Sequence, residues 1–172
     1  MTETFIAVRD FLEMGGQVLN VIAVVIFLMW MLILERIAYF QSELKTLKAA
    51  IQSTWNARMD KKSWASEALR EKLISEFNMS ANQYLPIIKT LVALCPLLGL
   101  MGTVTGMIEV FDVMAVSGSG NARSMASGVS KATIPTMAGM VGALSGVFLA
   151  TLLTQKVTTE VDSLEEQLSQ DD

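Results

Sequence analysis

Six polar side chains inside two long apolar stretches are the candidates for chemistry in this chain. Four carry hydroxyls and two carry charges: Thr103, Thr105, Thr133, Thr136, Glu109 and Lys131. Ionisable residues at membrane depth are costly, normally face protein or water, and by default mark an ion pathway. A hydroxyl both donates and accepts hydrogen bonds, which suits it to relay or hydrate a proton beside a carboxylate. The alternative for each threonine is a hydrogen bond to its own preceding helical turn and no further role.

The spacing of these residues about a short turn rich in Gly, Ser and Asn predicts two layers. Such a turn folds one helix back beside the other. Taking Gly120 as its centre, Glu109 lies eleven residues before it and Lys131 eleven after it. Thr103 lies seventeen residues before the centre and Thr136 sixteen after it. At about 1.5 Å per residue, an acid and a base share one layer, and two hydroxyls share another roughly 8–9 Å further in.

Glu109 and Lys131 are expected to pair, within one subunit or between neighbouring subunits. Pairing is the cheapest way to bury either charge, although the long stem of Lys131 could instead carry its ammonium toward the outer surface. Asp112 follows Thr105 and Glu109 on one helical face and is expected to be solvated near that surface.

The stretches that carry these residues are long enough to be transmembrane helices. Residues 86–116 and 124–155 each exceed the roughly 20 residues needed to cross the hydrocarbon core. Small residues recur in both and let helix backbones approach where no hydrophobic effect can drive association. The packing set is Gly99, Gly102, Gly106, Gly139, Gly142 and Gly146. Pro135 removes one backbone donor from the second of these helices and is expected to kink it.

Two motifs in this helical hairpin resemble a known family. The first reads Pro96-Leu-Leu-Gly-Leu-Met-Gly-Thr-Val-Thr-Gly106, and the second reads Gly128-Val-Ser-Lys-Ala-Thr-Ile-Pro-Thr-Met-Ala-Gly139. Together, and in this order, they resemble the MotA/TolQ/ExbB proton-channel family, most closely its ExbB members in a short variant. The resemblance covers both helices of the hairpin, and the layout of the rest of the chain agrees with it.

The resemblance implies a ring-forming channel subunit. It implies a pentamer around transmembrane helices of an ExbD-like single-span protein, whose intramembrane Asp carries protons. The complex would use the proton-motive force to energise TonB for uptake of iron–siderophores or similar nutrients. Thr103 and Thr136 would line the channel, and Thr105 and Thr133 are grouped with them as candidates. Lys131 departs from the pattern, because many ExbB and TolQ sequences carry Glu at the matching position, which argues against a direct proton-carrying role there.

The composition of the chain is that of a polytopic membrane protein. Of its 172 residues 52% are hydrophobic, concentrated in three long runs. The single cysteine, Cys95, excludes an internal disulfide framework. The sequence has no histidine, phosphate loop or nucleophile–base set, so it predicts neither an enzyme nor a metal or cofactor site. Basic and aromatic residues are not interleaved densely enough for nucleic-acid binding, so membrane lipid and protein partners are expected instead.

The expected fold is all-α, with three transmembrane helices extended by cytoplasmic helices and assembling as a ring. The predicted segments are an interfacial amphipathic segment over 1–16, transmembrane helices over 17–40, 86–116 and 124–155, a cytoplasmic helical loop over 41–85, a periplasmic turn over 117–123 and a cytoplasmic helical tail over 156–172.

Apolar residues at helical spacing predict two helices in the loop, separated by a break at 59–62, and a further helix in the tail. The three predicted stripes are Leu44, Leu47, Ile51 and Trp55; Trp64, Leu69, Leu73 and Phe77; and Val157, Val161, Leu164 and Leu168. Both of these tryptophans are expected in the core between the loop helices.

The distribution of basic residues predicts the orientation in a bacterial inner membrane. Nine Lys or Arg residues lie from Arg36 to Lys89, against Arg9 alone before the first span and Arg123 alone in the hairpin turn. By the positive-inside rule the loop and C-terminus are cytoplasmic and the N-terminus is periplasmic.

Two other functions remain open at this point. A TolQ-like motor would keep the ion pathway and serve envelope maintenance, whereas a non-conducting scaffold would assemble a partner without passing ions. A MotA-like flagellar stator is disfavoured, because such proteins normally have four spans.

Overall fold

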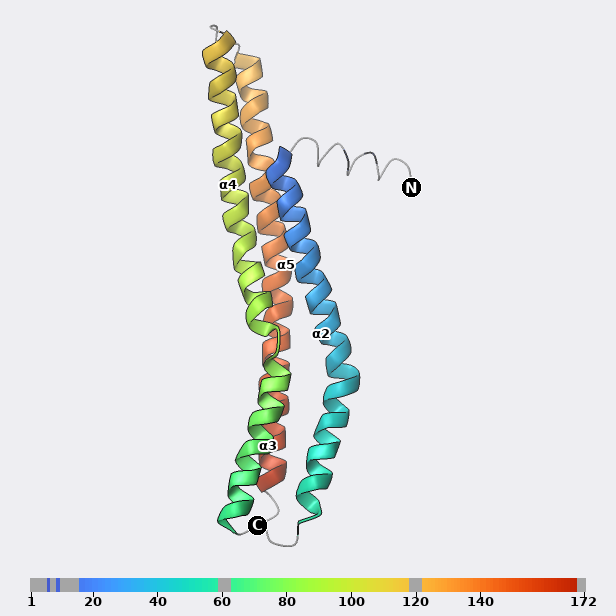
Figure 1. Ribbon diagram of the computed structural model, residues 1–172. Coiled ribbons are helices and arrows are strands. Elements are labelled where there is room, and N and C mark those ends of the chain that lie inside the picture. Colours follow the sequence, from blue (N-terminus) through green and yellow to red (C-terminus); the bar gives the residue numbers. More distant parts are fainter. Residues whose placement is uncertain (1–5, 7–8, 10–15, 59–62, 118–121, 170–172) are drawn as a thin grey trace. The chain divides into compact units, whose positions relative to one another are not determined.

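The computed structural model describes residues 6, 9, 16–58, 63–117 and 122–169. In these ranges the chain forms four long helices, α2 (Gly16–Asn56), α3 (Trp64–Asn82), α4 (Leu85–Ser117) and α5 (Ala122–Ser169) (Figure 1). The all-α prediction is therefore confirmed. Most of the predicted interfacial segment over 1–16, the loop break at 59–62 and the centre of the hairpin turn lie outside the described residues.

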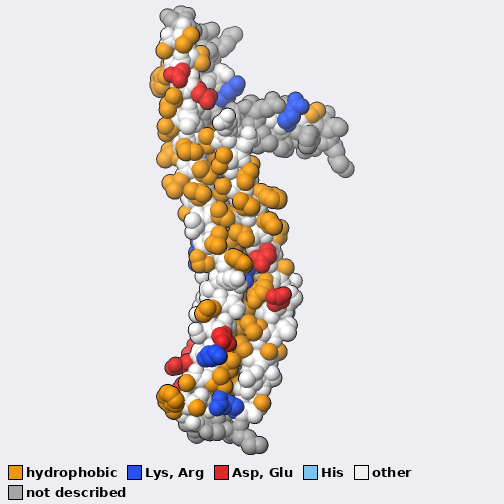
Figure 2. Space-filling view, viewed as in Figure 1, with side chains coloured by type: hydrophobic (Ala, Val, Ile, Leu, Met, Phe, Trp, Pro, Cys, Tyr) orange, Lys and Arg blue, Asp and Glu red, His pale blue; other side chains and the backbone are white. Residues whose placement is uncertain are grey.

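Three helical stretches are long and apolar enough to cross a membrane. They are Gly16–Asn56, Trp64–Val116 and Met125–Leu168. A helix suits such sequences because it satisfies every backbone hydrogen bond internally, as lipid requires. Figure 2 shows hydrophobic side chains spread over the visible surface of α2 and α4. The prediction of three apolar helices is confirmed.

The chain divides into two compact units. The first contains residues 1–30 and 89–147, and the second contains residues 31–88 and 148–172. In the first unit the start of α2 packs with α4 and α5 around buried Leu19, Ile22, Met29, Val92 and Cys95.

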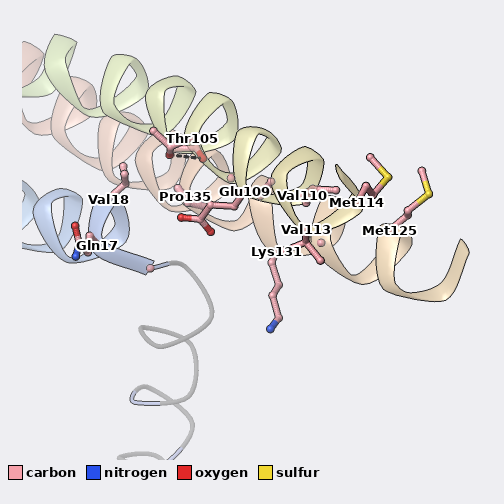
Figure 3. A pocket seen from close by; sticks show the side chains of 15 residues that line it. Gln17, Val18, Thr105, Glu109, Val110, Val113, Met114, Met125, Lys131 and Pro135 are labelled. Atoms are coloured by element: carbon pink, nitrogen blue, oxygen red, sulfur yellow. Dashed lines mark hydrogen bonds between the residues drawn. The ribbon is translucent and has the colours of Figure 1, made fainter. Parts of the chain in front are cut away.

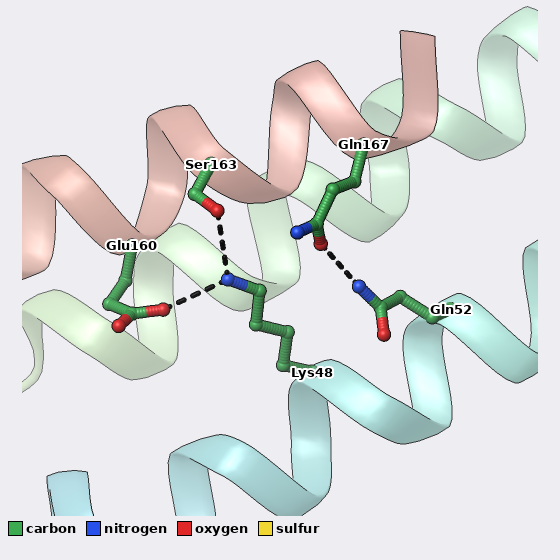
Figure 4. Close-up of polar contacts among 5 residues, drawn as sticks. All are labelled: Lys48, Gln52, Glu160, Ser163 and Gln167. Carbon is green, nitrogen blue, oxygen red and sulfur yellow. Dashed lines mark hydrogen bonds and ion pairs between the residues drawn. The ribbon is translucent and has the colours of Figure 1, made fainter. Parts of the chain in front are cut away.

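The core of the second unit contains large aliphatic and aromatic side chains. Its buried residues include members of all three predicted stripes: Leu44, Ile51, Trp55, Leu73, Phe77, Val157, Leu164 and Leu168. Polar contacts tie α2 to α5 in this unit (Figure 4). The Lys48 ammonium lies 2.9 Å from a Glu160 carboxylate oxygen and donates to the Ser163 hydroxyl at 3.1 Å. The Gln52 amide donates to the Gln167 side-chain oxygen.

The prediction that Trp64 lies in the core between the loop helices is wrong, because its side chain is 86% exposed. Trp64 opens α3, whose buried face is made by Ser66, Leu73, Phe77 and Ala81. At 3.6 residues per turn, nine residues separate Trp64 from Leu73 by about two and a half turns. The tryptophan therefore points away from the side that Leu73 buries.

Arg36 of α2 is the buried cation of the second unit, with 1% of its surface exposed. Its guanidinium donates to the Ser80 carbonyl at 3.1 Å and to the Gln83 carbonyl. It also lies 4.9 Å from the centre of the Tyr39 ring and 5.4 Å from that of Tyr84. The last carbonyls of a helix lack partners within the helix, and a cation there also suits the helix dipole. Arg36 thus caps the C-terminal end of α3.

The helical conformation is interrupted at the residue beside this cap. Tyr84 has φ 64°, the left-handed conformation that non-glycine residues rarely adopt. It separates α3 from α4, and Pro86 follows two residues later. A residue directly before proline is disfavoured in the α conformation, so the sequence itself supports a break close to this position.

We predict that Arg36→Met lowers the free energy of unfolding of the chain. A buried carbonyl left without its donor costs about 1–3 kcal/mol, and this substitution removes the donor of two partly buried hydrogen bonds. Chemical unfolding in mild detergent, followed by circular dichroism, measures the loss. Lys45→Met removes an exposed cation from the same helix and serves as the control. Equal losses in the two variants would contradict the capping role.

Candidate functional site

The seam between α4 and α5 is the closest helix contact in the first unit. A Cβ atom added at Gly139 would lie 2.5 Å from the Cys95 carbonyl oxygen, and one added at Gly99 would lie 2.9 Å from the Thr136 Cα atom. Both neighbours are backbone atoms, which cannot move aside as the tip of a side chain can. The two helices therefore touch backbone to backbone at this level.

The remaining small residues of the packing set fit two different helices. Gly102 accommodates the Pro135 ring of α5, and Gly106 accommodates Ala132, whose Cβ would be 2.7 Å from an added Cβ. Gly142 of α5 instead faces Ile26 of α2, and Gly146 faces both Met29 of α2 and Val92 of α4. Small residues on α5 thus admit both α4 and α2.

The four candidate threonines behave differently. The Thr136 hydroxyl donates across the seam to the Gly99 carbonyl at 2.8 Å. Thr103 donates to Leu100, Thr105 to Met101 and Gly102, and Thr133 to Ser130, all within their own helices. Three of the four threonines therefore make the bond to their own helix that is expected of a threonine without a functional role. Thr136 alone of the four links α4 with α5.

The contacts also set the register of the hairpin. Gly102 faces Pro135, Gly106 faces Ala132, and Gly128 faces Val110. These pairs lie two to three residues, about 3–5 Å, from the register that is symmetric about Gly120. Thr103 and Thr136 therefore lie at similar depth, although the Thr136 hydroxyl bonds to the Gly99 carbonyl one turn from Thr103.

A cavity of about 670 Å³ lies between the start of α2 and the α4–α5 pair. Its wall contains both intramembrane charges, Glu109 and Lys131, together with Thr105 and Pro135. Figure 3 shows the Glu109 carboxylate directed toward the start of α2, and the Lys131 side chain extending from α5 on the same side. The structure thus brings the acid and the base to one cavity.

Glu109 and Lys131 do not form an ion pair with each other in the described part of this single chain. Both side chains are exposed, so pairing between neighbouring subunits stays a prediction. Asp112 is exposed and is not among the lining residues of the cavity. Pro135 is buried inside a continuous α5, where its ring packs against Gly102.

Sequence reasoning did not find two parts of this arrangement. Gln17 and Val18 line the cavity from α2. In the sequence they mark only the beginning of an apolar run, which does not predict a cavity. The sequence marks Arg36 only as the first of the nine basic residues that predict the orientation. Its neighbour Tyr39, one helical turn away, is the signal that could have suggested a buried guanidinium stacked on an aromatic ring.

These features define a polytopic helical membrane protein built on a close-packed hairpin that carries hydroxyls and charges. Residues 38–166 match the family model described as MotA/TolQ/ExbB proton channel family. The chain therefore belongs to this family, whose members are transport proteins rather than enzymes.

Curated relatives agree with this assignment. A putative biopolymer transport protein ExbB-like 1 from Synechocystis is 38% identical over 79 residues, covering 44% of this chain and 31% of that protein. A second Synechocystis protein, ExbB-like 3, is 28% identical over 49% of this chain and 41% of its own length. A putative ExbB homolog from Methanothermobacter thermautotrophicus is 27% identical over 94% of this chain and 68% of its own length. The chain thus matches less than half the length of the two cyanobacterial relatives.

We predict that Gly139→Ala destabilises the hairpin more than Gly128→Ala does. The first substitution places a methyl group against the Cys95 carbonyl, whereas the second meets a methyl group of the Val110 side chain, which yields at lower cost than backbone does. Overpacking of this kind costs typically about 1–3 kcal/mol. Unfolding of both variants in a graded series of denaturing detergent measures the difference. Equal stability would show that the helices separate more easily than the backbone contact implies.

Proposed function

We propose that the chain is a proton-channel subunit of an inner-membrane motor. Together with an ExbD-like protein it would use the proton-motive force to energise TonB-dependent transport across the outer membrane. In this proposal the spans are residues 17–40, 86–116 and 124–155, with the N-terminus periplasmic and the C-terminus cytoplasmic. Family membership and the ExbB-type relatives support the proposal.

The observation that carries this proposal is the position of the Thr136 hydroxyl. Its hydrogen is held by the Gly99 carbonyl at 2.8 Å, so the orientation of the group is fixed. The oxygen keeps acceptor capacity and can accept a hydrogen bond from a protonated carboxyl group. A partner Asp that passes this level would alternate between a protonated form that donates to Thr136 and an ionised form that does not.

Uncovered apolar surface on α4 and α5 supports assembly with further helices. The exposed large residues on these helices include Leu97, Leu100, Val104, Ile108, Met137, Met140, Val141 and Leu144. In a ring, here proposed as a pentamer, neighbouring copies and the partner's helix would cover these residues and bring Thr103 and Thr136 to the channel.

The proton-motive force can drive the proposed motor without a bound nucleotide. Moving one elementary charge across 100 mV yields about 2.3 kcal/mol. Several protons per cycle would therefore supply enough free energy to change contacts between helices.

We predict that Thr136→Val reduces proton flux about tenfold or more while leaving the assembly intact. The change keeps the shape of the side chain and removes its hydrogen-bonding group, and a tenfold loss corresponds to about 1.4 kcal/mol, the scale of one hydrogen bond. Flux is measured with a pH-sensitive dye in proteoliposomes that contain the chain and its co-purified single-span partner. Thr159→Val is the matched control, because Thr159 is an exposed residue of α5 that bonds only to Gln155 within the described residues.

The outcomes separate the proposed function from its alternatives. Unchanged flux in Thr136→Val would remove the assigned role of this hydroxyl, and absence of flux in the native complex would indicate a scaffold. Co-purification with TonB supports the transport task, whereas a TolR-like partner would assign the same motor to envelope maintenance.

A further inference from the structure

We propose that the cavity between α2, α4 and α5 binds the headgroup of an aminophospholipid of the phosphatidylethanolamine class. This inference concerns a lipid site and does not depend on proton conduction. It starts from an unusual pair of wall residues. Glu109 and Lys131 both line the cavity, and no ion pair joins them within the described chain. One fixed anion and one fixed cation thus share a single cavity.

The two charges match the two charges of a phosphoethanolamine group. The ammonium of Lys131 would donate to the phosphate oxygens, and the carboxylate of Glu109 would accept from the ligand's ammonium. Charge-assisted hydrogen bonds of this kind are the strong ones. Glu109 comes from α4 and Lys131 from α5, whose contacts at Gly106 and Ala132 hold this part of the two helices together. The two charges therefore reach one cavity from two helices that are in contact.

The rest of the cavity suits the glycerol and upper acyl region of a lipid. Its apolar wall is formed by Val110, Val113, Met114, Met125 and Pro135. The volume, about 670 Å³, lies in the range of sites that hold small organic ligands. A phospholipid headgroup falls within this size.

The position of the cavity along α2 supports a lipid as the occupant. The cavity is lined by Gly16, Gln17 and Val18, where the apolar run of α2 begins. Exposed apolar side chains continue from Gln17 along the same helical face, at Val21, Val24 and Leu28. A lipid with its headgroup in the cavity would therefore lay an acyl chain along this stripe.

The charge pattern distinguishes the ethanolamine headgroup from those of other phospholipids. An anionic phosphatidylglycerol offers a phosphate to Lys131 but no cation to Glu109. Phosphatidylcholine has a quaternary ammonium, which has no N–H to donate. The ethanolamine headgroup supplies a partner with hydrogen bonds for both residues.

The test is lipid retention by the full chain, purified with its partner. The complex is reconstituted into bilayers of equal parts phosphatidylethanolamine, phosphatidylglycerol and phosphatidylcholine, transferred to mild detergent and weighed by native mass spectrometry. We expect phosphatidylethanolamine to be retained preferentially. Lys131→Met and Glu109→Gln should each weaken this retention about tenfold, the effect of about 1.4 kcal/mol, and Lys131→Arg should preserve it.

The matched controls are Lys72→Met and Glu76→Gln. These residues form an exposed ion pair on α3, 3.6 Å apart, outside the cavity, and their substitution should leave lipid retention unchanged. Equal retention of the three lipids, or equal retention by the wild type and by both cavity variants, would overturn the proposal.

Two further outcomes would assign the cavity to another occupant and also overturn the proposal. If the wild type retains no lipid and Lys131→Met dissociates the oligomer, the two charges belong to a contact between copies. If deletion of residues 1–15 is required before lipid binds, the N-terminal segment occupies the cavity in the native chain. If Lys131→Met or Glu109→Gln loses lipid binding and keeps its proton flux, the lipid site is independent of the proposed proton channel.

Discussion

Helices α4 and α5 meet backbone to backbone at Gly99 and Gly139, and the rest of the first unit depends on that contact. Inside a bilayer the hydrophobic effect does not press helices together, so close packing and hydrogen bonds must hold them. A side chain at either glycine would meet backbone atoms of the facing helix. The same closeness places Thr136 within 2.8 Å of the Gly99 carbonyl. The Thr136 hydroxyl of the proposed pathway thus reaches its acceptor because glycines let the two helices approach so closely.

The helices make room for charge where α2 begins. Gly106 and Ala132 keep α4 and α5 in contact, while Glu109 and Lys131 lie on the wall of a cavity that α2 closes from a third direction. A charge at membrane depth needs a partner or a polar surrounding, and a cavity provides space for one. Close packing at the seam and an accommodating cavity beside it are therefore two results of one distribution of small residues.

Much of the fold followed from the sequence because it depends on local patterns. Continuous apolar runs predicted the three long helices, and helical spacing found most of the core of the second unit, including Ile51, Phe77 and Leu164. Features that depend on contacts between distant segments were harder to predict. Trp64 was misplaced because a stripe near a helix end has few residues to fix its phase. Arg36 was missed because its partners lie 44 and 47 residues away.

The cap at Arg36 has a mechanical consequence. The hydrogen-bonded ladder of α3 ends at Asn82, and that of α4 begins at Leu85, with Tyr84 between them in the left-handed conformation. The contact between the end of α3 and the residue that precedes α4 therefore depends on a side chain of α2, because the Arg36 guanidinium bonds to the Ser80 and Gln83 carbonyls and lies beside the Tyr84 ring.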